Sequence, residues 1–203
     1  MLLAGCASMS KSECLYADWQ AVGFEDGASG AHASAVASRR QACARAGVTP
    51  DMAAYLAGRD QGLMEFCTPA NGFRTGERGA AYSGVCARHN EASFLDEYRA
   101  GAHLYLLRDR VLAARHALHQ ATSDLGAIDA ETVYASTALI RPDLTVAERA
   151  KLVVELTRLS EESDRIERAL PPLQSTLDIA WAELNDYERE LALRSYPARI
   201  AAR

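Results

Sequence analysis

The most reactive pattern in this sequence is a cysteine close to its N-terminus. Leu3-Ala4-Gly5-Cys6 places an apolar and two small residues before a thiol, the pattern of a lipobox, where a signal peptidase cleaves and the cysteine receives diacylglycerol. Such signals also carry a basic start and roughly 7–15 apolar residues, which a start site assigned too late would leave out. A cytoplasmic chain with a chance tetrapeptide is the alternative. We therefore expect residues 1–6 to be the remnant of a lipoprotein signal peptide, with lipidation at Cys6.

The other four cysteines, Cys14, Cys43, Cys67 and Cys86, form an even set within the first 86 residues. An even, clustered set is typical of disulfides in an oxidising compartment. The set allows three pairings, and we expect Cys14–Cys43 and Cys67–Cys86 because each closes a short local loop. Zinc sites normally need closely paired cysteines, which this sequence lacks. The cysteines therefore predict two disulfides rather than a metal site.

Other side chains that could do chemistry have a simpler interpretation. His116 and His119 lie three residues apart and could form part of a metal-binding helix face, but solvated polar residues explain them as well. Cys86 with His89 could form a thiol nucleophile and its base, but a disulfide accounts for Cys86. We therefore predict no catalytic residue, no metal and no cofactor.

Sequence-wide properties exclude further classes of function. The chain contains no H-E-x-x-H, G-x-S-x-G or G-x-x-x-x-G-K-[ST] motif. Its net charge of −5 provides no basic field for a nucleic acid. No apolar run approaches the roughly 18 residues that a transmembrane helix needs.

The composition changes near residue 103 and predicts two regions, 7–103 and 104–203. Twelve of the thirteen glycines and all five cysteines lie at or before Gly101. In the first region an aromatic residue repeatedly precedes glycines three or four positions apart, a spacing that lets another backbone approach one helix face. We expect short helices joined by turns at residues 47–51 and 68–72.

The aromatic and glycine motifs of the first region resemble those of a known family. The motifs that carry the resemblance are Asp18-Trp19, Gly23-x-x-Asp26-Gly27-x-x-Gly30, Cys43-x-x-x-Gly47-Val48-x-Pro50-Asp51, Tyr55-x-x-Gly58-Arg59-x-x-Gly62-Leu63-x-x-Phe66-Cys67-Thr68-Pro69-x-Asn71-Gly72, and Gly76-x-x-Gly79-x-x-Tyr82-x-Gly84-Val85-Cys86. Residues 6–107 resemble the proteobacterial lipoproteins that carry the domain of unknown function 2799. The resemblance implies lipoprotein export, the four cysteines and a helical C-terminal segment, but no activity.

Five polar residues within or next to these motifs are candidates for a binding site. They are Asp26, Arg59, Asn71, Glu77 and Arg78. We favour turn caps and local ion pairs over a binding site as the role of these residues.

The second region carries two apolar stripes at the 3-4 spacing of a helix face. The first stripe comprises Leu104, Leu107, Val111, Ala114, Leu118, Ala121, Leu125 and Ile128. The second comprises Leu152, Leu156, Leu159, Ser163, Ile166, Leu170, Leu173, Leu177, Ala180, Leu184, Tyr187 and Leu191. The stripes predict an antiparallel helical hairpin, with self-association as a coiled coil as the alternative. Pro171-Pro172 should break or sharply kink the second helix.

The sequence therefore predicts an all-α protein in which a small, Gly-rich domain with two disulfides precedes a long helical hairpin. We expect a lipoprotein of the outer membrane that faces the periplasm and acts as a non-catalytic interaction or scaffold module. Its expected partners are the membrane, through Cys6, and other envelope proteins, through the helical region. A periplasmic binder of a small ligand or metal is the alternative, and an envelope hydrolase ranks last.

Overall fold

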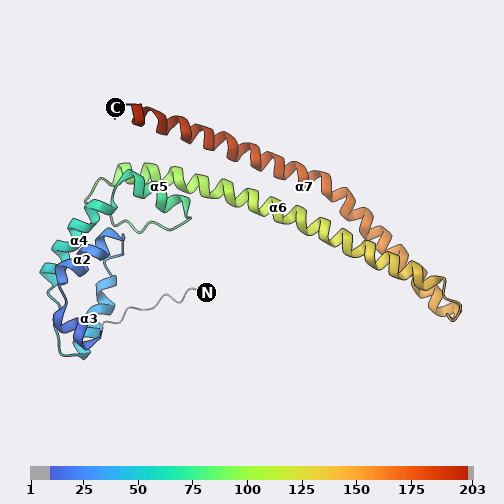
Figure 1. The fold of residues 1–203 in the computed structure, drawn as a ribbon, viewed down its shortest axis with the longest axis horizontal. Helices are drawn as coiled ribbons and strands as arrows, with labels where there is room; N and C mark the ends of the chain where they lie inside the picture. Colours follow the sequence, from blue (N-terminus) through green and yellow to red (C-terminus); the bar gives the residue numbers. More distant parts are fainter. Residues whose placement is uncertain (1–9, 201–203) are drawn as a thin grey trace. The chain divides into compact units, whose positions relative to one another are not determined.

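The computed structural model describes the backbone of residues 10–200 and the side chains of residues 10–194, and this part of the chain is helical without strands. The helices are α1 (Lys11–Tyr16), α2 (Trp19–Ala28), α3 (Ala35–Arg45), α4 (Met52–Phe66), α5 (Pro69–Glu77), α6 (Glu91–Leu139) and α7 (Val146–Ile200) (Figure 1). They form two compact units, the first ending at Tyr105 and the second beginning at Leu106. The all-α prediction is confirmed, and the units divide two residues beyond the expected boundary.

Polar residues set the starts of the short helices. Asp18 accepts hydrogen bonds from two backbone N–H groups at the start of α2, and Asp51 accepts one from Ala54 at the start of α4. Thr68 caps α5 in the same way, with Pro69 in the first turn, where proline loses no helical hydrogen bond. The predicted turn at residues 68–72 is wrong for residues 69–72. Thr68 caps α5, which begins at Pro69, so Asn71-Gly72 lies within the helix.

Helices α2 and α4 lie side by side in close backbone contact (Figure 1). A Cβ atom on Gly23 would lie 2.0 Å from the carbonyl oxygen of Tyr55, and one on Gly58 would lie 1.9 Å from that of Gln20. Gly27 and Gly62 are enclosed in the same way, by Arg59 and Phe24 respectively. The two helices therefore approach through reciprocal glycine pairs, which explains the spacing of these glycines in the sequence.

The same arrangement recurs between α5 and the start of α6. A Cβ atom on Gly76 would lie 2.1 Å from the Tyr98 carbonyl oxygen, and one on Gly101 would lie 2.2 Å from that of Phe73. In both pairs a left-handed glycine also faces an aromatic ring: Gly30 faces Phe66, and Gly79 faces Tyr105. The first unit therefore contains two helix pairs built to one plan.

A disulfide accompanies each helix pair. Cys14–Cys43 links the segments that precede α2 and α4, and Cys67–Cys86 links those that precede α5 and α6, with Cα–Cα distances of 5.4 Å and 5.6 Å. This is the predicted pairing. Each disulfide lies in a small apolar cluster, the first with Trp19 and Tyr55, the second with Leu63 and Phe94. The disulfides therefore supply part of the core of each pair.

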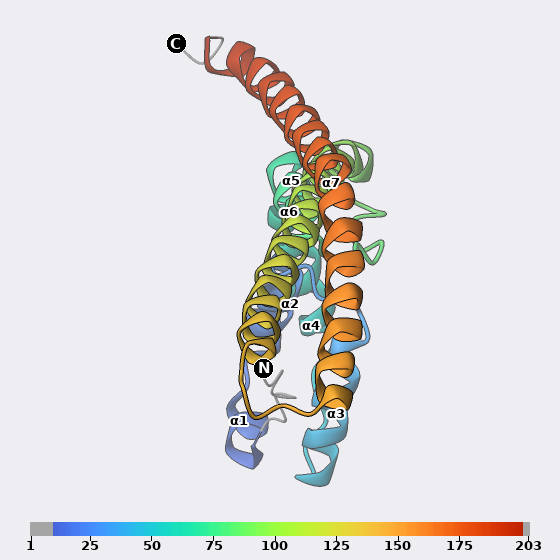
Figure 2. The same ribbon diagram turned by 90° about the vertical axis from the view of Figure 1, so that its right-hand side faces the viewer.

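The second unit is an antiparallel pair formed by α6 from residue 106 and by α7 (Figures 1 and 2). Every residue from 106 onward in the two predicted stripes is buried or half-buried. Ion pairs fix the register, with Arg108 3.2 Å from Glu188 and Arg110 3.1 Å from Glu183. The predicted hairpin is confirmed.

The turn of the hairpin is closed from both sides. Thr145 and Glu148 form the capping box that starts α7. From the first turns of α7, Arg149 donates to the carbonyl of Leu139 and, at 2.6 Å, to that of Arg141. A charged donor thus satisfies backbone acceptors that the end of α6 leaves open.

The two prolines do not end α7. The helix is continuous through Pro171-Pro172, and Figure 2 shows one ribbon that bends partway along its length. The carbonyls that lose their N–H partners belong to the exposed residues Glu167 and Arg168, where water can replace the lost bonds. Leu170 and Leu173 continue the seam on either side, so packing maintains the helix. Of the two expected outcomes, a break is absent, and the helix bends instead.

Among the described helices, none combines the length and apolarity that crossing a bilayer requires.

Candidate functional site

The predicted lipidation site, Cys6, lies outside the residues that the structure describes. The other four cysteines are all oxidised. Cys86 is fully buried and bonded to Cys67, so it has no thiol to pair with His89 as a nucleophile. The chemistry of the described cysteines is therefore structural.

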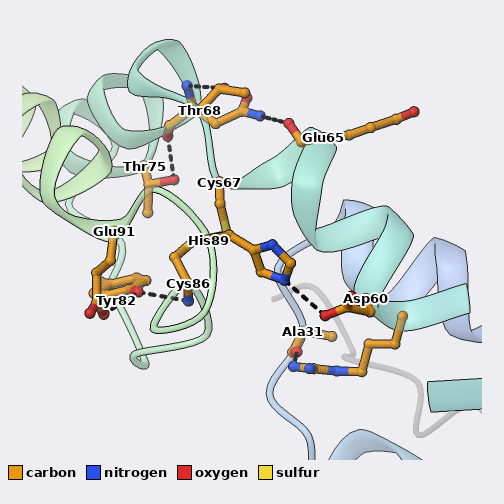
Figure 3. The surroundings of a disulfide bond; sticks show 12 residues. Ala31, Asp60, Glu65, Cys67, Thr68, Thr75, Tyr82, Cys86, His89 and Glu91 are labelled. Atoms are coloured by element: carbon orange, nitrogen blue, oxygen red, sulfur yellow. Dashed lines mark hydrogen bonds and ion pairs between the residues drawn. A yellow bond between two sulfur atoms is a disulfide. The ribbon is translucent and has the colours of Figure 1, made fainter. Parts of the chain in front are cut away.

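The Cys67–Cys86 disulfide positions the segment that precedes α6 (Figure 3). The backbone N–H of Cys86 donates to the Tyr82 hydroxyl at 2.8 Å, and this hydroxyl donates to Glu91, also at 2.8 Å. Burial is the main cause that raises the pKa of Tyr82. The N–H of His89 donates to the Cys86 carbonyl at 2.7 Å. The disulfide thus fixes the backbone from which His89 projects.

His89 points toward α4 and lies within hydrogen-bonding distance of Asp60 (Figure 3). Its Nε2 atom lies 3.0 Å from the Asp60 carboxylate, and the His89 side chain is largely shielded from solvent whereas Asp60 is exposed. This contact joins the segment before α6 to α4.

A cavity of about 680 Å³ lies beside this pair. Three stretches line it: the segment after α2, one face of α4, and residues 83–89. Its polar lining comprises His32, Arg59, Asp60, Ser83, Arg88 and His89, and its apolar lining includes Leu56, Leu63 and Val85. The cavity is the place where histidine, arginine, serine and carboxylate side chains from distant parts of the sequence meet.

Arg59 is the central cation of this cavity. Its Nη2 atom donates to the Ala31 carbonyl at 2.9 Å. Its Nε–H is buried and has no hydrogen-bond partner in the described structure. An unsatisfied buried donor costs about 1–3 kcal/mol, so this arrangement is incomplete as a purely structural contact.

Ser83, His89 and Asp60 share the cavity but do not form a catalytic triad. A triad needs a hydrogen bond between the nucleophile and its base, and in the described structure His89 bonds to Asp60 whereas Ser83 has no bond to His89. In the described structure these three residues are therefore not arranged as a triad.

Asp26, another predicted candidate, belongs to a separate buried network. Its carboxylate accepts hydrogen bonds from Arg39 at 2.5 Å and from the Tyr55 hydroxyl at 2.8 Å. Burial, reinforced by the bond to Asp26, raises the pKa of Tyr55 to about 12. This network joins α2, α3 and α4, and its contacts are those of a structural ion pair.

The remaining candidate residues from the family motifs make local contacts. Asn71 donates to the Glu65 carbonyl at 2.9 Å, and Arg78 donates to the Arg74 carbonyl at 3.0 Å. Glu77 lies in the last turn of α5. Among the five predicted residues, Arg59 alone lines the main cavity, so the five do not form one site.

His116 and His119 are exposed on α6. Within the described part of the chain, no group of three or more potential metal-binding side chains comes together.

Sequence reasoning missed four polar residues of the cavity: His32, Asp60, Ser83 and Arg88. None belongs to a recognisable motif, and they lie on segments whose proximity depends on the packing of α4. The disulfide between Cys67 and Cys86 was the available signal, because it predicts that the chain around residue 86 lies against the end of α4.

Comparison with known proteins finds one family model, which covers part of the chain. Residues 18–103 match a family model described as a protein of unknown function, DUF2799. No curated protein and no solved structure matches the chain. The matched segment includes both helix pairs that pack through glycines and all three stretches that line the cavity. Residues 18–103 of this chain are therefore a domain of unknown function 2799, the family that its glycine and cysteine motifs resemble.

Proposed function

We propose that this chain is a non-catalytic scaffold lipoprotein of the outer membrane. In this proposal Cys6 carries the lipid anchor, the disulfide-linked domain faces the periplasm, and the helical hairpin contacts another envelope protein. The two disulfides support an oxidising compartment, because such bonds are rare in the cytosol.

The observation that carries this proposal is the apolar surface around the hairpin turn. Six large apolar side chains there are more than half exposed: Val133, Tyr134, Ile140, Val146, Val153 and Val154. These side chains lie on both sides of the turn along the chain, and contiguous exposed apolar surface marks interaction sites, whereas the hairpin's own stripes already fill the seam between the helices. Both acidic and basic groups flank the turn, including Arg141, Asp143 and Lys151. The surface that we propose for the partner therefore combines exposed apolar side chains with charges of both signs.

Photo-crosslinking in intact cells tests this surface. A photoreactive phenylalanine derivative at Tyr134 probes the turn, and the same residue at Leu112, also exposed on α6, is the matched control. We expect adducts heavier than the chain from position 134 but not from position 112. Adducts of twice the chain mass would indicate self-association instead. Equal yields at both positions, or none at position 134, would contradict the proposal.

Substitution of the lipidated cysteine tests the anchor. Because a buried lipid chain contributes about 0.8 kcal/mol per CH₂ group, Cys6→Ser should move the protein from the membrane fraction to the soluble periplasmic fraction. Lys11→Ser, five residues away, is the control and should stay membrane-bound. Retention of the Cys6 variant in membranes would exclude a lipid anchor at this position.

A further inference from the structure

The charges around the main cavity of the first unit are not balanced. Arg59 and Arg88 both line it, and neither has a carboxylate partner within ion-pair distance in the described structure. Asp60 is the acidic residue of the lining, and its carboxylate contacts His89 rather than either arginine. In a chain whose net charge is −5, this concave surface therefore carries two guanidinium groups against one carboxylate.

The hydrogen-bonding groups of the cavity are donors. Arg59 uses one N–H for the Ala31 carbonyl and keeps a buried Nε–H that meets no acceptor among the described residues. Arg88 is exposed and adds a second guanidinium, a group whose fork of N–H donors matches the oxygens of carboxylates and phosphates.

His32 and Ser83 add neutral donors. The Nδ1 atom of His32 contacts the Ser34 hydroxyl at 2.9 Å and the Ser34 backbone N–H at 3.3 Å. These contacts leave Nε2 for a ligand, to which it donates when it carries the ring proton. The Ser83 hydroxyl precedes Gly84, whose left-handed φ of 75° turns the chain at the rim. A ligand rich in acceptor oxygens would satisfy all of these groups together.

The remaining lining is apolar and sets a second requirement. Leu56, Leu63 and Val85 contribute to the cavity wall, and ligand cavities commonly combine such walls with a few convergent polar groups. A volume of about 680 Å³ suits a small molecule rather than a protein segment.

We propose that this cavity binds a small molecule through an oxyanion, a phosphate or carboxylate group, held by Arg59 and Arg88. The guanidinium groups of Arg59 and Arg88 donate to the anion, and His32 and Ser83 add further polar groups. The aliphatic wall receives the rest of the ligand. The His89–Asp60 contact holds the segment that carries Arg88 against α4.

Nuclear magnetic resonance on the whole chain tests this proposal with two probes, inorganic phosphate and acetate, at constant pH and ionic strength. The Arg59 Nε–H signal reports on the guanidinium that the proposal places against the anion. We expect it to shift in a saturable manner with at least one probe. A response to phosphate alone identifies a phosphate-bearing ligand, and a response to acetate alone identifies a carboxylate. Failure to saturate with both probes would overturn the proposal.

Arg88→Ala and Arg45→Ala form a matched pair for this titration. Both arginines are exposed, so neither substitution should disturb folding, but only Arg88 lines the cavity. Loss of one charged contact should raise the apparent Kd of the probe about tenfold in Arg88→Ala. The Kd should be unchanged in Arg45→Ala. Equal behaviour of the two variants would show that the shifts arise from general screening and would overturn the assignment.

Discussion

Gly58 is the residue at which one methyl group should change stability most clearly. A Cβ atom there would lie 1.9 Å from the Gln20 carbonyl oxygen and 2.7 Å from its carbon. These are backbone atoms, so relief requires α2 and α4 to separate. We expect Gly58→Ala to lower the free energy of unfolding by at least about 2 kcal/mol, measured by urea denaturation.

Gly126→Ala is the control for Gly58→Ala. Gly126 lies within α6, and a methyl group added there would meet no described atom within 4 Å beyond the backbone of its own helix. Alanine should therefore stabilise the helix by up to about 1 kcal/mol. Opposite signs for the two substitutions would separate a packing glycine from a tolerated one. A neutral Gly58→Ala would contradict the close approach of α2 and α4.

Tyr55 should make stability depend on alkaline pH. Its pKa is raised to about 12 in the folded protein, whereas an unfolded chain loses the same proton near pH 10. Between these values the unfolded state binds fewer protons, so the free energy of unfolding should fall as pH rises from about 10 to 12. Below pH 10 this contribution is fully present.

Tyr55→Phe separates this effect from that of the other tyrosines. The variant should lack the absorbance component that titrates near pH 12, and its stability should depend less on pH in that window. At neutral pH it should lose about 1 kcal/mol, because Asp26 loses one donor but keeps its bond to Arg39. An unchanged titration curve would place Tyr55 in solvent.

At the scale of helices, the seam between α6 and α7 contains one fully buried leucine, Leu159, which is 1% exposed. Leu159→Ala should lower the free energy of unfolding of the hairpin by about 2–5 kcal/mol. Val154, on the same helix but 70% exposed, is the matched control, and Val154→Ala should change stability by less than about 0.5 kcal/mol. Thermal melting followed by circular dichroism would compare them.

The concentration dependence of the same melts distinguishes two origins of the seam. If the seam closes within one chain, the melting temperature should not change with protein concentration, whereas a seam between chains would melt higher as concentration rises. Leu118 and Leu156 belong to the same two stripes but are only half-buried. Truncation of Leu159 should therefore change the stability of the seam more than truncation of either. Similar melting of Leu159→Ala and the parent would mean that the hairpin is not closed by this seam.

Local rules predicted most helices because the signals were local. The 3-4 spacing of Leu152, Leu156 and Leu159 requires one face of a helix, and Thr145 with Glu148 marks its start whatever the rest of the chain does. Pro171-Pro172 left two outcomes open, a break or a kink, and the structure has a continuous helix that bends. A choice between them depends on whether tertiary packing outweighs two lost hydrogen bonds, and a sequence does not show the solvent access of the carbonyls concerned.

At the scale of the whole molecule, distance in the sequence limited what could be predicted. The disulfide pairing was predictable because each loop is short, 29 and 19 residues apart in sequence. The cavity was not, because its three stretches meet only after α2 and α4 have packed. Arg59 could be selected as a candidate because it lies in the motif around Gly58 and Gly62. Nothing in the local sequence distinguished Arg88 or Asp60 from other surface charges.

The distribution of the disulfides predicts that reduction affects the two units differently. Both bonds lie in the first unit, and each stabilises by about 3 kcal/mol in the loop-entropy model. The hairpin from residue 106 depends on its own apolar seam and ion pairs. Reduction should therefore loosen the first unit and leave the hairpin unchanged.

Hydrogen exchange measured by mass spectrometry, with and without a phosphine reductant, resolves the two responses. We expect faster exchange in α2 and α4 after reduction and unchanged exchange around Leu159 and Leu184, which are buried in the hairpin. A variant with Cys14→Ser and Cys43→Ser sharpens the test, because it should loosen α2 and α4 while Cys67–Cys86 continues to hold the second helix pair. Faster exchange throughout the hairpin would show that its stability depends on the disulfide-linked unit, because loss of bonds in one unit would then destabilise the other.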